Sequence, residues 1–202
     1  MHTKGKFIVF EGTDGSGKTT QMSLLGEYLK NKGIACELTR EPTTSPFGQL
    51  LRDCLKCKLD TGEDTIAALF AADRLDHIRS MRAALERGVT VLCDRYYFSS
   101  FAYNGGFVSL DWVIELNRLA MQEFPPDLVI YLDLTPEESM ARVGEREEKE
   151  RYETLEKQSK IRAKYFEVFE KVGGNIAIVK SEAEKLGTQE KVRAAAEKLF
   201  KA

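Results

Sequence analysis

The chain contains the stretch Gly12-Thr13-Asp14-Gly15-Ser16-Gly17-Lys18-Thr19, and this stretch decides the fold. It matches the pattern G-x-x-x-x-G-K-[ST] and lies between an apolar run, Phe7 to Phe10, and a helical pattern, Lys18 to about Lys32. A strand before the glycines and a helix after them are the context that this pattern requires. The glycines let the backbone curl so that successive N–H groups point at phosphate oxygens, and the helix N-terminus adds its partial positive charge. We therefore expect a cradle for the phosphates of a nucleoside triphosphate.

Two side chains of this cradle have chemical roles of their own. Lys18 supplies a flexible point charge for the β- and γ-phosphates, and the Thr19 hydroxyl can ligate Mg²⁺. The alternative is a glycine-rich turn without a ligand, and the pattern arises by chance in about one in a hundred chains of this length. The expected nucleotide-binding residues are Gly12, Thr13, Asp14, Gly15, Ser16, Gly17, Lys18, Thr19 and Thr20.

Apolar runs alternate with helical patterns along the rest of the chain. Strands are predicted at residues 7–10, 34–38, 89–93, 128–132 and 175–179. Helices are predicted at 18–32, 97–103, 110–123 and 186–201, before Arg87 and Lys171, and from Pro136 after an N-cap at Thr135. This alternation predicts an α/β protein with the three-layer α/β/α P-loop NTPase fold and a five-stranded parallel sheet. No repeat or linker divides residues 1–202, so a single domain is expected.

The composition argues against some classes of protein. The 202 residues include 30 basic and 32 acidic side chains, a formal net charge of −2, and a protein that coats nucleic acid needs a basic excess. No stretch reaches the roughly 18 apolar residues that span a bilayer, and no apolar run follows a basic flank as in a secretory signal. We therefore expect a cytoplasmic protein that binds small molecules, without nucleic-acid or membrane partners.

Residues that follow the predicted strands carry the next information, because ligands of such sheets bind beyond the carboxyl ends of the strands. The third strand ends in Asp94 and Arg95. An acidic residue here can hold Mg²⁺ or its water, as a Walker-B carboxylate does, and the adjacent arginine adds a planar clamp for phosphate. Without the glycine-rich stretch, the same pair would indicate only a local ion pair at the end of a strand.

Several short strings, by their order and spacing, resemble the thymidylate kinase family over nearly the whole chain. They are Phe10-Glu11-Gly12, Arg40-Glu41-Pro42, Phe70-Ala71-Ala72-Asp73-Arg74, Asp94-Arg95-Tyr96 followed by Ser99 and Tyr103, Pro126-Asp127-Leu128, and Glu150-Arg151-Tyr152-Glu153. Each string alone is weakly specific, whereas their combination is highly specific. The resemblance implies an enzyme that uses ATP and Mg²⁺ to phosphorylate thymidine monophosphate (dTMP) to the diphosphate (dTDP).

The resemblance also implies an acceptor site. Phe70 would stack on the thymine, and Arg74, four residues on and so on the same helical face, would donate to a thymine carbonyl. Tyr103 would pack against the sugar and leave no room for a ribose 2′-hydroxyl. Asp14 would accept from the 3′-hydroxyl, and Arg95 would hold the acceptor phosphate; a core phenylalanine and a turn aspartate are the alternatives for Phe70 and Asp14. The expected acceptor-binding residues are Asp14, Arg40, Phe70, Arg74, Arg95, Ser99, Ser100 and Tyr103.

A dense charge run indicates either a solvated helix face or, by the resemblance, a short lid over ATP at about residues 142–153. Closure of a lid would exclude water and suppress wasteful hydrolysis. Some family members carry a basic residue at the place of Gly15, and in members without one, as here, lid arginines supply charge in the transition state. Such an arginine is worth roughly 10³–10⁵ in rate. The expected catalytic residues are Lys18, Asp94, Arg95 and, in order of preference, the lid arginines Arg146, Arg151 and Arg142; the expected metal ligands are Thr19 and Asp94.

Two other functions fit part of the pattern. One is a kinase for another nucleoside monophosphate or for a deoxynucleoside. The other is an ATP-binding switch without transfer activity, whose sequence would not need Phe70, Arg74 and Tyr103 together. Members of the thymidylate kinase family are typically homodimers, so the resemblance implies that assembly as well.

Overall fold

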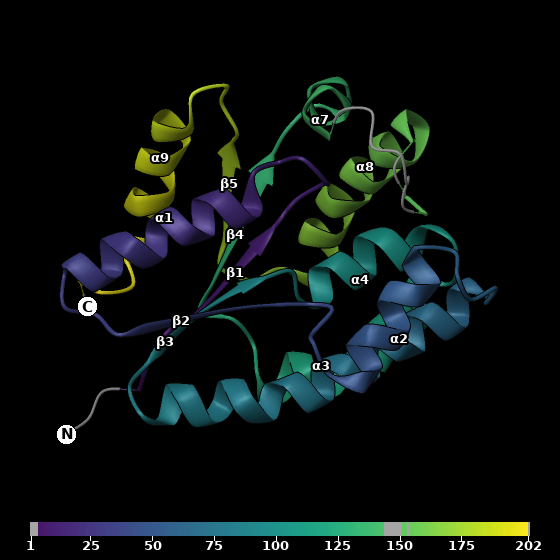
Figure 1. The fold of residues 1–202 in the computed structure, drawn as a ribbon, viewed down its shortest axis with the longest axis horizontal. Coiled ribbons are helices and arrows are strands. Elements are labelled where there is room, and N and C mark those ends of the chain that lie inside the picture. Colours follow the sequence, from purple (N-terminus) through teal and green to yellow (C-terminus); the bar gives the residue numbers. More distant parts are fainter. Residues whose placement is uncertain (1–3, 144–150, 153, 202) are drawn as a thin grey trace.

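Every strand of the sheet runs in the same direction, and the strand order is β2-β3-β1-β4-β5 (Figure 1). The strands are β1 (Phe7–Glu11), β2 (Cys36–Arg40), β3 (Thr90–Asp94), β4 (Leu128–Asp133) and β5 (Ile176–Lys180). The computed structural model describes residues 4–143, 151–152 and 154–201, and all five strands lie among them. Phe10 pairs with Asp94 of β3 and with Ile130 of β4, so the carboxyl ends of the central strands lie level at one edge. The predicted five-stranded parallel sheet is confirmed.

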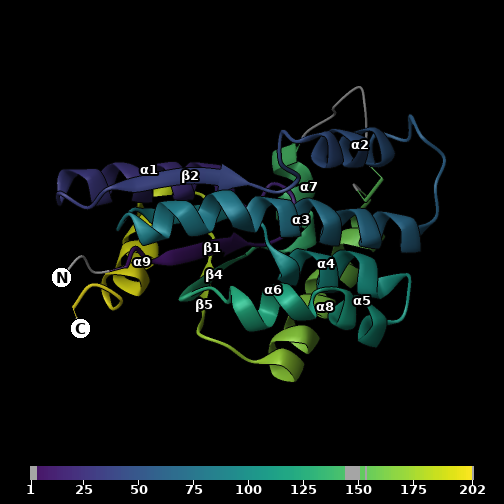
Figure 2. The ribbon, with the colours of Figure 1, turned by 90° about the horizontal axis from the view of Figure 1, so that it is seen from below.

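Helices cover both faces of the sheet (Figures 1 and 2). They are α1 (Lys18–Asn31), α2 (Pro46–Leu55), α3 (Glu63–Glu86), α4 (Tyr97–Tyr103), η1 (Asn104–Gly106), α5 (Leu110–Leu116), α6 (Arg118–Glu123), α7 (Pro136–Val143), α8 (Leu155–Val172) and α9 (Lys185–Glu197). Ile8 and Phe10 of β1 face α1 and α9, whereas Phe7 and Val9 face the core under α3, α4 and α8. Because both faces are buried, β1 is a continuous apolar run up to its last residue.

The start of α7 follows from local hydrogen bonding. The Thr135 hydroxyl accepts from the Glu138 N–H at 3.3 Å, and the Glu138 carboxylate accepts from the Thr135 N–H at 3.2 Å. This reciprocal pair is a capping box, and Pro136 occupies the first helical position, where its missing N–H costs nothing. The predicted N-cap at Thr135 is therefore confirmed.

Most predicted bounds differ from the structure by a few residues, and two of the differences have a clear physical cause. The second strand begins at Cys36 rather than at residue 34, because its register is set by pairing with β3, where Arg40 lies opposite Asp94. The helix predicted over residues 110–123 is broken into α5 and α6 at Asn117, whose buried side-chain amide donates to the Val113 carbonyl at 2.8 Å. The proposed lid falls mostly outside the described residues, so it remains a prediction, as does the single domain.

No helix in the described parts of the chain combines the length and the apolarity that crossing a membrane requires.

Candidate active site

The glycine-rich turn between β1 and α1 has backbone angles that only glycine adopts easily. The φ angles are 144° at Gly12, 74° at Gly15 and 91° at Gly17. A Cβ atom on Gly12 would also lie 2.7 Å from the carbonyl oxygen of Leu132, closer than real side chains approach. These residues thus form a tight loop whose backbone faces the N-terminus of α1, as a phosphate cradle requires.

The ammonium group of Lys18 lies inside this loop. It donates to the carbonyls of Gly12 at 3.1 Å and Thr13 at 2.9 Å. Burial, and then the positive charge of Arg95, lower the pKa of Lys18 to about 8, while Asp94 and Asp14 oppose this shift. A phosphate in the loop would supply the negative charge that a buried ammonium needs.

An acidic residue and a hydroxyl meet where α1 begins beside the end of β3. The Thr19 hydroxyl donates to Asp94 Oδ2 at 2.8 Å. The other carboxylate oxygen of Asp94 is buried and has no hydrogen-bond partner within residues 4–143, 151–152 and 154–201. Hydroxyl and carboxylate oxygens are the ligands that Mg²⁺ prefers, and an unpaired buried carboxylate oxygen fits a cation bound directly or through water. The two predicted metal ligands are therefore adjacent and suited to that ion.

Arg95 lies at the centre of the site and in the left-handed backbone region, with φ 72°. Its guanidinium donates to the Gly12 carbonyl at 3.2 Å and to the Ser99 hydroxyl at 3.1 Å, and it pairs with Asp14 at 2.5 Å. Its guanidinium carbon also lies 4.9 Å from the centre of the Tyr103 ring. Burial would raise the pKa of Asp14, but the positive charges of Arg95 and Lys18 outweigh it and lower that pKa. Arg95 thereby joins the phosphate loop to the helix that follows β3.

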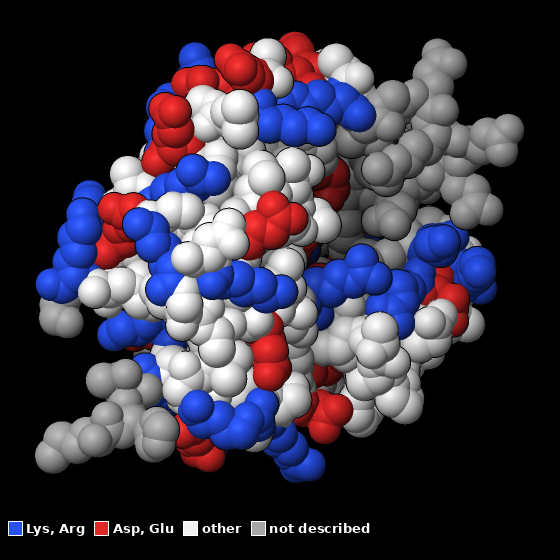
Figure 3. All heavy atoms as spheres, turned by 60° about the vertical axis from the view of Figure 1, so that its left-hand side comes forward, with Lys and Arg blue, Asp and Glu red and all other residues white. Residues whose placement is uncertain are grey.

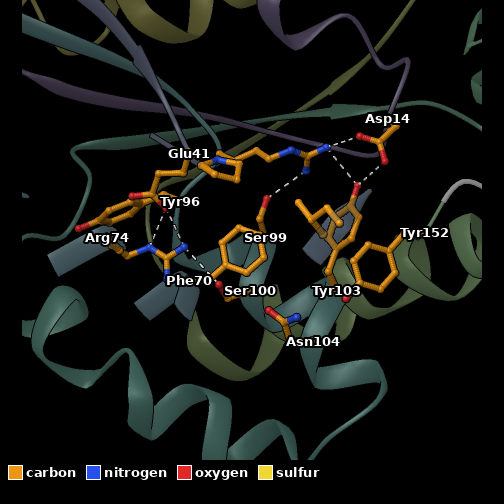
Figure 4. A pocket seen from close by; sticks show the side chains of 13 residues that line it. Asp14, Glu41, Phe70, Arg74, Tyr96, Ser99, Ser100, Tyr103, Asn104 and Tyr152 are labelled. Carbon is orange, nitrogen blue, oxygen red and sulfur yellow. Dashed lines mark hydrogen bonds and ion pairs between the residues drawn. The ribbon is translucent and has the colours of Figure 1, made fainter. Parts of the chain in front are cut away.

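Two cavities meet at this arginine. The larger, about 550 Å³, is lined by the phosphate loop, Arg40, Asp94 and Arg142. The smaller, about 100 Å³, extends toward α3 and α4 (Figure 4). Residues that line both cavities are Asp14, Glu41, Pro42, Leu55 and Arg95. The predicted acceptor residues that line the smaller cavity are Asp14, Phe70, Arg74, Arg95, Ser99, Ser100 and Tyr103. The elements thus bring the predicted donor and acceptor residues into one continuous site.

Arg74 is more deeply buried than its place on a helix face suggested. Its side chain is 1% exposed and pairs with Glu41 at 2.7 Å, and it also donates to the Ser100 hydroxyl at 3.2 Å and to the Asn117 side chain. The guanidinium lies over the Tyr96 ring, 5.4 Å from its centre. Glu41 and Asn117 were not predicted as site residues, because neither is near Arg74 in the sequence.

The remaining predicted arginines lie in different surroundings. Arg40 ends β2, is exposed, and lines the larger cavity. Arg142, at the end of α7, lines the same cavity and donates to the Ser181 hydroxyl at 3.0 Å and to the Glu182 carbonyl at 2.9 Å. Arg151 is instead paired with Glu63 at 2.8 Å. Arg146 lies outside the described residues.

Comparison with known proteins connects this geometry to one family. The family model described as thymidylate kinase matches residues 10–192. The chain belongs to the thymidylate kinase family. It is 41% identical over 178 residues to a protein named probable thymidylate kinase from Thermococcus kodakarensis, covering 81% of this chain and 84% of the relative. A protein of the same name from Methanococcus aeolicus is 42% identical over 179 residues, covering 86% of each chain. A thymidylate kinase from Thermomicrobium roseum is 45% identical over 139 residues, covering 67% of this chain and 66% of the relative.

This member of the thymidylate kinase family is therefore an enzyme of the phosphotransferase class, and the predicted family is confirmed. Within it, Glu11 is a buried site residue to which sequence reasoning gave no role, although it stands in the Phe10-Glu11-Gly12 string. Its carboxylate accepts from the Ser99 hydroxyl at 2.6 Å, the Tyr165 hydroxyl at 2.8 Å and the Tyr96 N–H at 2.9 Å. Burial raises the pKa of Glu11, against the hydrogen bond from Ser99 and the charge of Arg95.

Asn104 was also missed, although its sequence position carried a signal. It follows Ser100 by four residues, so a continued helical turn places both side chains on one face. The side chain is fully buried and lines the smaller cavity. Neither atom of its amide forms a hydrogen bond of good geometry in the described chain, although the amide interacts with the Tyr152 hydroxyl and opposes the rise in the pKa of that group. Buried amides without well-formed hydrogen bonds are rare in proteins, so this amide could exchange its interaction with Tyr152 for hydrogen bonds to a ligand.

Proposed function

We propose that this enzyme transfers the γ-phosphate of ATP to dTMP and so forms ADP and dTDP. The observation that supports this most directly is the meeting of the two cavities at Asp14 and Arg95. One cavity has the features of a triphosphate cradle, and the other those of a pocket for a base and sugar. A kinase for nucleoside monophosphates needs the γ-phosphate of ATP and the phosphate of the acceptor to face each other at such a junction.

The donor side would hold ATP together with Mg²⁺. The backbone N–H groups of the glycine-rich loop, the N-terminus of α1 and Lys18 would bind the β- and γ-phosphates. Thr19 and Asp94 would hold the metal ion, whose charge would neutralise the transferring phosphate when bound.

The acceptor side would hold the thymine base. Phe70 presents a half-buried ring at the cavity, and a base stacked on such a ring gains about 1–3 kcal/mol. Arg74 has five N–H donors and can keep its contacts to Glu41 while donating to a thymine carbonyl. Asn104 offers one acceptor and a donor pair, which complement the N3–H and a carbonyl of thymine.

The sugar would lie between Tyr103 and Asp14. The Tyr103 hydroxyl donates to Asp14 at 3.2 Å and accepts from Arg95 at the same distance. Asp14 would accept from the 3′-hydroxyl, and the Tyr103 ring would occupy the space that a ribose 2′-hydroxyl needs. The site would therefore prefer deoxyribose.

Transfer itself would ask little covalent work of the protein. An oxygen of the monophosphate would attack the γ-phosphorus in line, without a protein nucleophile, while Arg95 holds the acceptor phosphate and Lys18 the donor. Among the lid arginines, Arg142 lines the donor cavity and Arg151 is paired elsewhere, while Arg146 stays the first choice from the sequence.

Three further features belong to the proposal. Mg²⁺ is expected as the metal on the chemistry of Thr19 and Asp94. A homodimer is expected from the family resemblance, and a cytoplasmic location remains a prediction of the sequence. Basic and acidic side chains are mixed over the face shown in Figure 3, in keeping with small-molecule rather than nucleic-acid partners.

The proposal is tested by measuring ADP formation from ATP and Mg²⁺ with dTMP, dUMP, dCMP, dGMP, AMP, CMP, UMP or no acceptor. We expect strong stimulation by dTMP, weaker stimulation by dUMP and little by the others, because the proposed contacts are made to a thymine base and a deoxyribose. If another monophosphate stimulated ADP formation more than dTMP does, the protein would still be a nucleoside monophosphate kinase, but the assignment of dTMP as its acceptor would be refuted. ATP binding without stimulation by any acceptor would favour the non-catalytic switch.

A further inference from the structure

Glu63, the first residue of α3, holds two residues that lie far from it in the sequence. Its Oε1 accepts from Arg151 Nε at 2.8 Å, and its Oε2 accepts from the Tyr152 hydroxyl at 2.6 Å. The Arg151 backbone N–H donates to the Leu55 carbonyl at 3.1 Å, and its guanidinium donates to the Thr61 carbonyl at 3.3 Å. One carboxylate at the start of α3 thus fixes the short segment 151–152.

Tyr152 is a wall of the acceptor cavity. It is 5% exposed, lines that cavity, and presents its ring edge-on to Tyr103 at 5.4 Å between ring centres (Figure 4). Gln158 donates to the Tyr152 carbonyl at 2.9 Å and to Asp14 at 3.2 Å. Tyr152 is therefore held at its backbone by Gln158 and at its hydroxyl by Glu63.

We propose that Glu63 is a positioning residue for acceptor binding and that it acts through the Tyr152 hydroxyl. The proposal rests on the proposed function, since it concerns the same cavity. A tyrosine ring held at both ends presents one fixed surface to Tyr103, and Tyr103 in turn borders the sugar position. Without the carboxylate, the buried hydroxyl would lose its hydrogen-bond acceptor and keep only its interaction with the Asn104 side chain, so the ring would shift toward another acceptor.

The two contacts of Glu63 contribute unequally. The side chains of Arg151 and Glu63 are 22% and 19% exposed, and partly hydrated ion pairs contribute little net free energy. The hydroxyl of Tyr152 is buried, and the carboxylate gives it a charge-assisted hydrogen bond, which is the stronger kind. The effect on the acceptor should therefore follow Tyr152 rather than Arg151.

The test compares wild type, Glu63→Ala, Glu63→Gln, Tyr152→Phe and the Glu63→Ala/Tyr152→Phe double variant. Acceptor binding is measured by calorimetry with dTMP, and KM for dTMP and for ATP by ADP formation. We expect Glu63→Ala and Tyr152→Phe each to weaken dTMP binding about tenfold, the size of one charge-assisted hydrogen bond, with KM for ATP nearly unchanged. The double variant should bind dTMP no more weakly than the weaker-binding single variant does, because Glu63→Ala and Tyr152→Phe remove the same hydrogen bond.

Two variants separate this role from an effect of the ion pair with Arg151 and from an effect of negative charge at the start of α3. Glu63→Gln keeps an acceptor for the Tyr152 hydroxyl but removes the ion pair, so it should bind dTMP nearly as wild type does. Asp64→Ala removes the neighbouring exposed acid from the same helical turn, which controls for the helix dipole, and should leave dTMP binding unchanged.

Unchanged dTMP binding in Glu63→Ala, or additive losses in the double variant, would overturn the proposal. If Glu63→Ala folds poorly, Tyr152→Phe with Glu63→Gln still decides the matter, because normal dTMP binding in Tyr152→Phe contradicts a role for the hydroxyl. Failure of wild type to bind dTMP would instead refute the proposed function.

Discussion

Asn104 and Arg74 are single buried polar residues to which the proposed function gives a role in recognition. The Arg74 guanidinium is neutralised by Glu41, whereas the Asn104 amide forms no hydrogen bond of good geometry among the described residues and interacts only weakly with the Tyr152 hydroxyl. A buried polar group without a well-formed hydrogen bond costs about 1–3 kcal/mol, and a ligand that bonds to the Asn104 amide would offset that cost. The proposed ligand edge is the N3–H and carbonyl of thymine.

Replacement of Asn104 by leucine should separate recognition from stability. Leucine has a similar size and no polar atoms, so we expect an unfolding temperature equal to or above that of wild type. We expect kcat/KM for dTMP to fall by about 10–100-fold, because two hydrogen bonds to the base would be lost, while KM for ATP stays the same. Thermal unfolding and steady-state kinetics measure these outcomes, and unaltered kcat/KM for dTMP would exclude Asn104 from the acceptor site.

At the residue scale, the sequence predicted which residues lie together better than it predicted their partners. Phe70, Arg74, Ser100 and Tyr103 do line one cavity, because helical spacing brings them to one side of α3 and α4. Their partners could not be predicted in the same way. The Glu41 contact of Arg74 depends on how β2 and α3 pack, and no local pattern contains that information.

At the scale of elements, the start of α4 also depends on a contact that the local sequence does not predict. Residues 97–103 were predicted as a helix with these bounds, yet Tyr96, at the N-cap, provides no side-chain cap within the described chain. Glu11 at the end of β1 replaces it, because its Oε1 accepts from the N–H groups of Tyr96 at 2.9 Å and Ser99 at 3.2 Å. The cap comes from a neighbouring strand, so the sequence around the helix gives no sign of it.

Removal of this cap should weaken both the fold and the site. Glu11→Ala would leave two backbone N–H groups and two hydroxyls without their acceptor, so we expect the free energy of unfolding to fall by at least about 2 kcal/mol. Urea unfolding measures this loss. Glu11→Gln keeps one acceptor oxygen, so its free energy of unfolding should lie between those of wild type and Glu11→Ala. Glu27→Ala changes an exposed residue of α1 and should leave the free energy of unfolding unchanged. An unfolding midpoint for Glu11→Ala equal to that of wild type would contradict the capping role.

On the scale of the whole molecule, the parallel sheet explains why distant sequence segments form one site. Asp94 ends β3 and Arg95 follows it, while the glycine-rich turn follows β1, and these two adjacent strands have level carboxyl ends. The alternation of apolar runs and helical patterns was enough to predict a parallel sheet with its ligands at the carboxyl ends of the strands. It could not predict the strand order, because apolar runs that are buried on both faces carry no record of which neighbour they pair with.

The outer surface carries a further prediction about assembly. Helices α3, α5 and α6 lie beside one another on the side seen in Figure 2, and they expose the large apolar side chains of Leu75, Trp112 and Leu119. Together with the family resemblance, this favours a homodimer that buries this side, because large apolar side chains on adjacent elements gain free energy when covered.

Sedimentation equilibrium of the wild-type chain should therefore give the mass of two chains. Leu75→Glu combined with Leu119→Glu should reduce this to the mass of one chain, since both changes place a charge where apolar contact is expected. Leu186→Glu is the matched control: this leucine is 60% exposed on α9, which covers the opposite face of the sheet, and its replacement should leave the dimer intact. A wild-type mass of one chain would refute the homodimer. A dimer that survives the double change would place the interface elsewhere on the molecule.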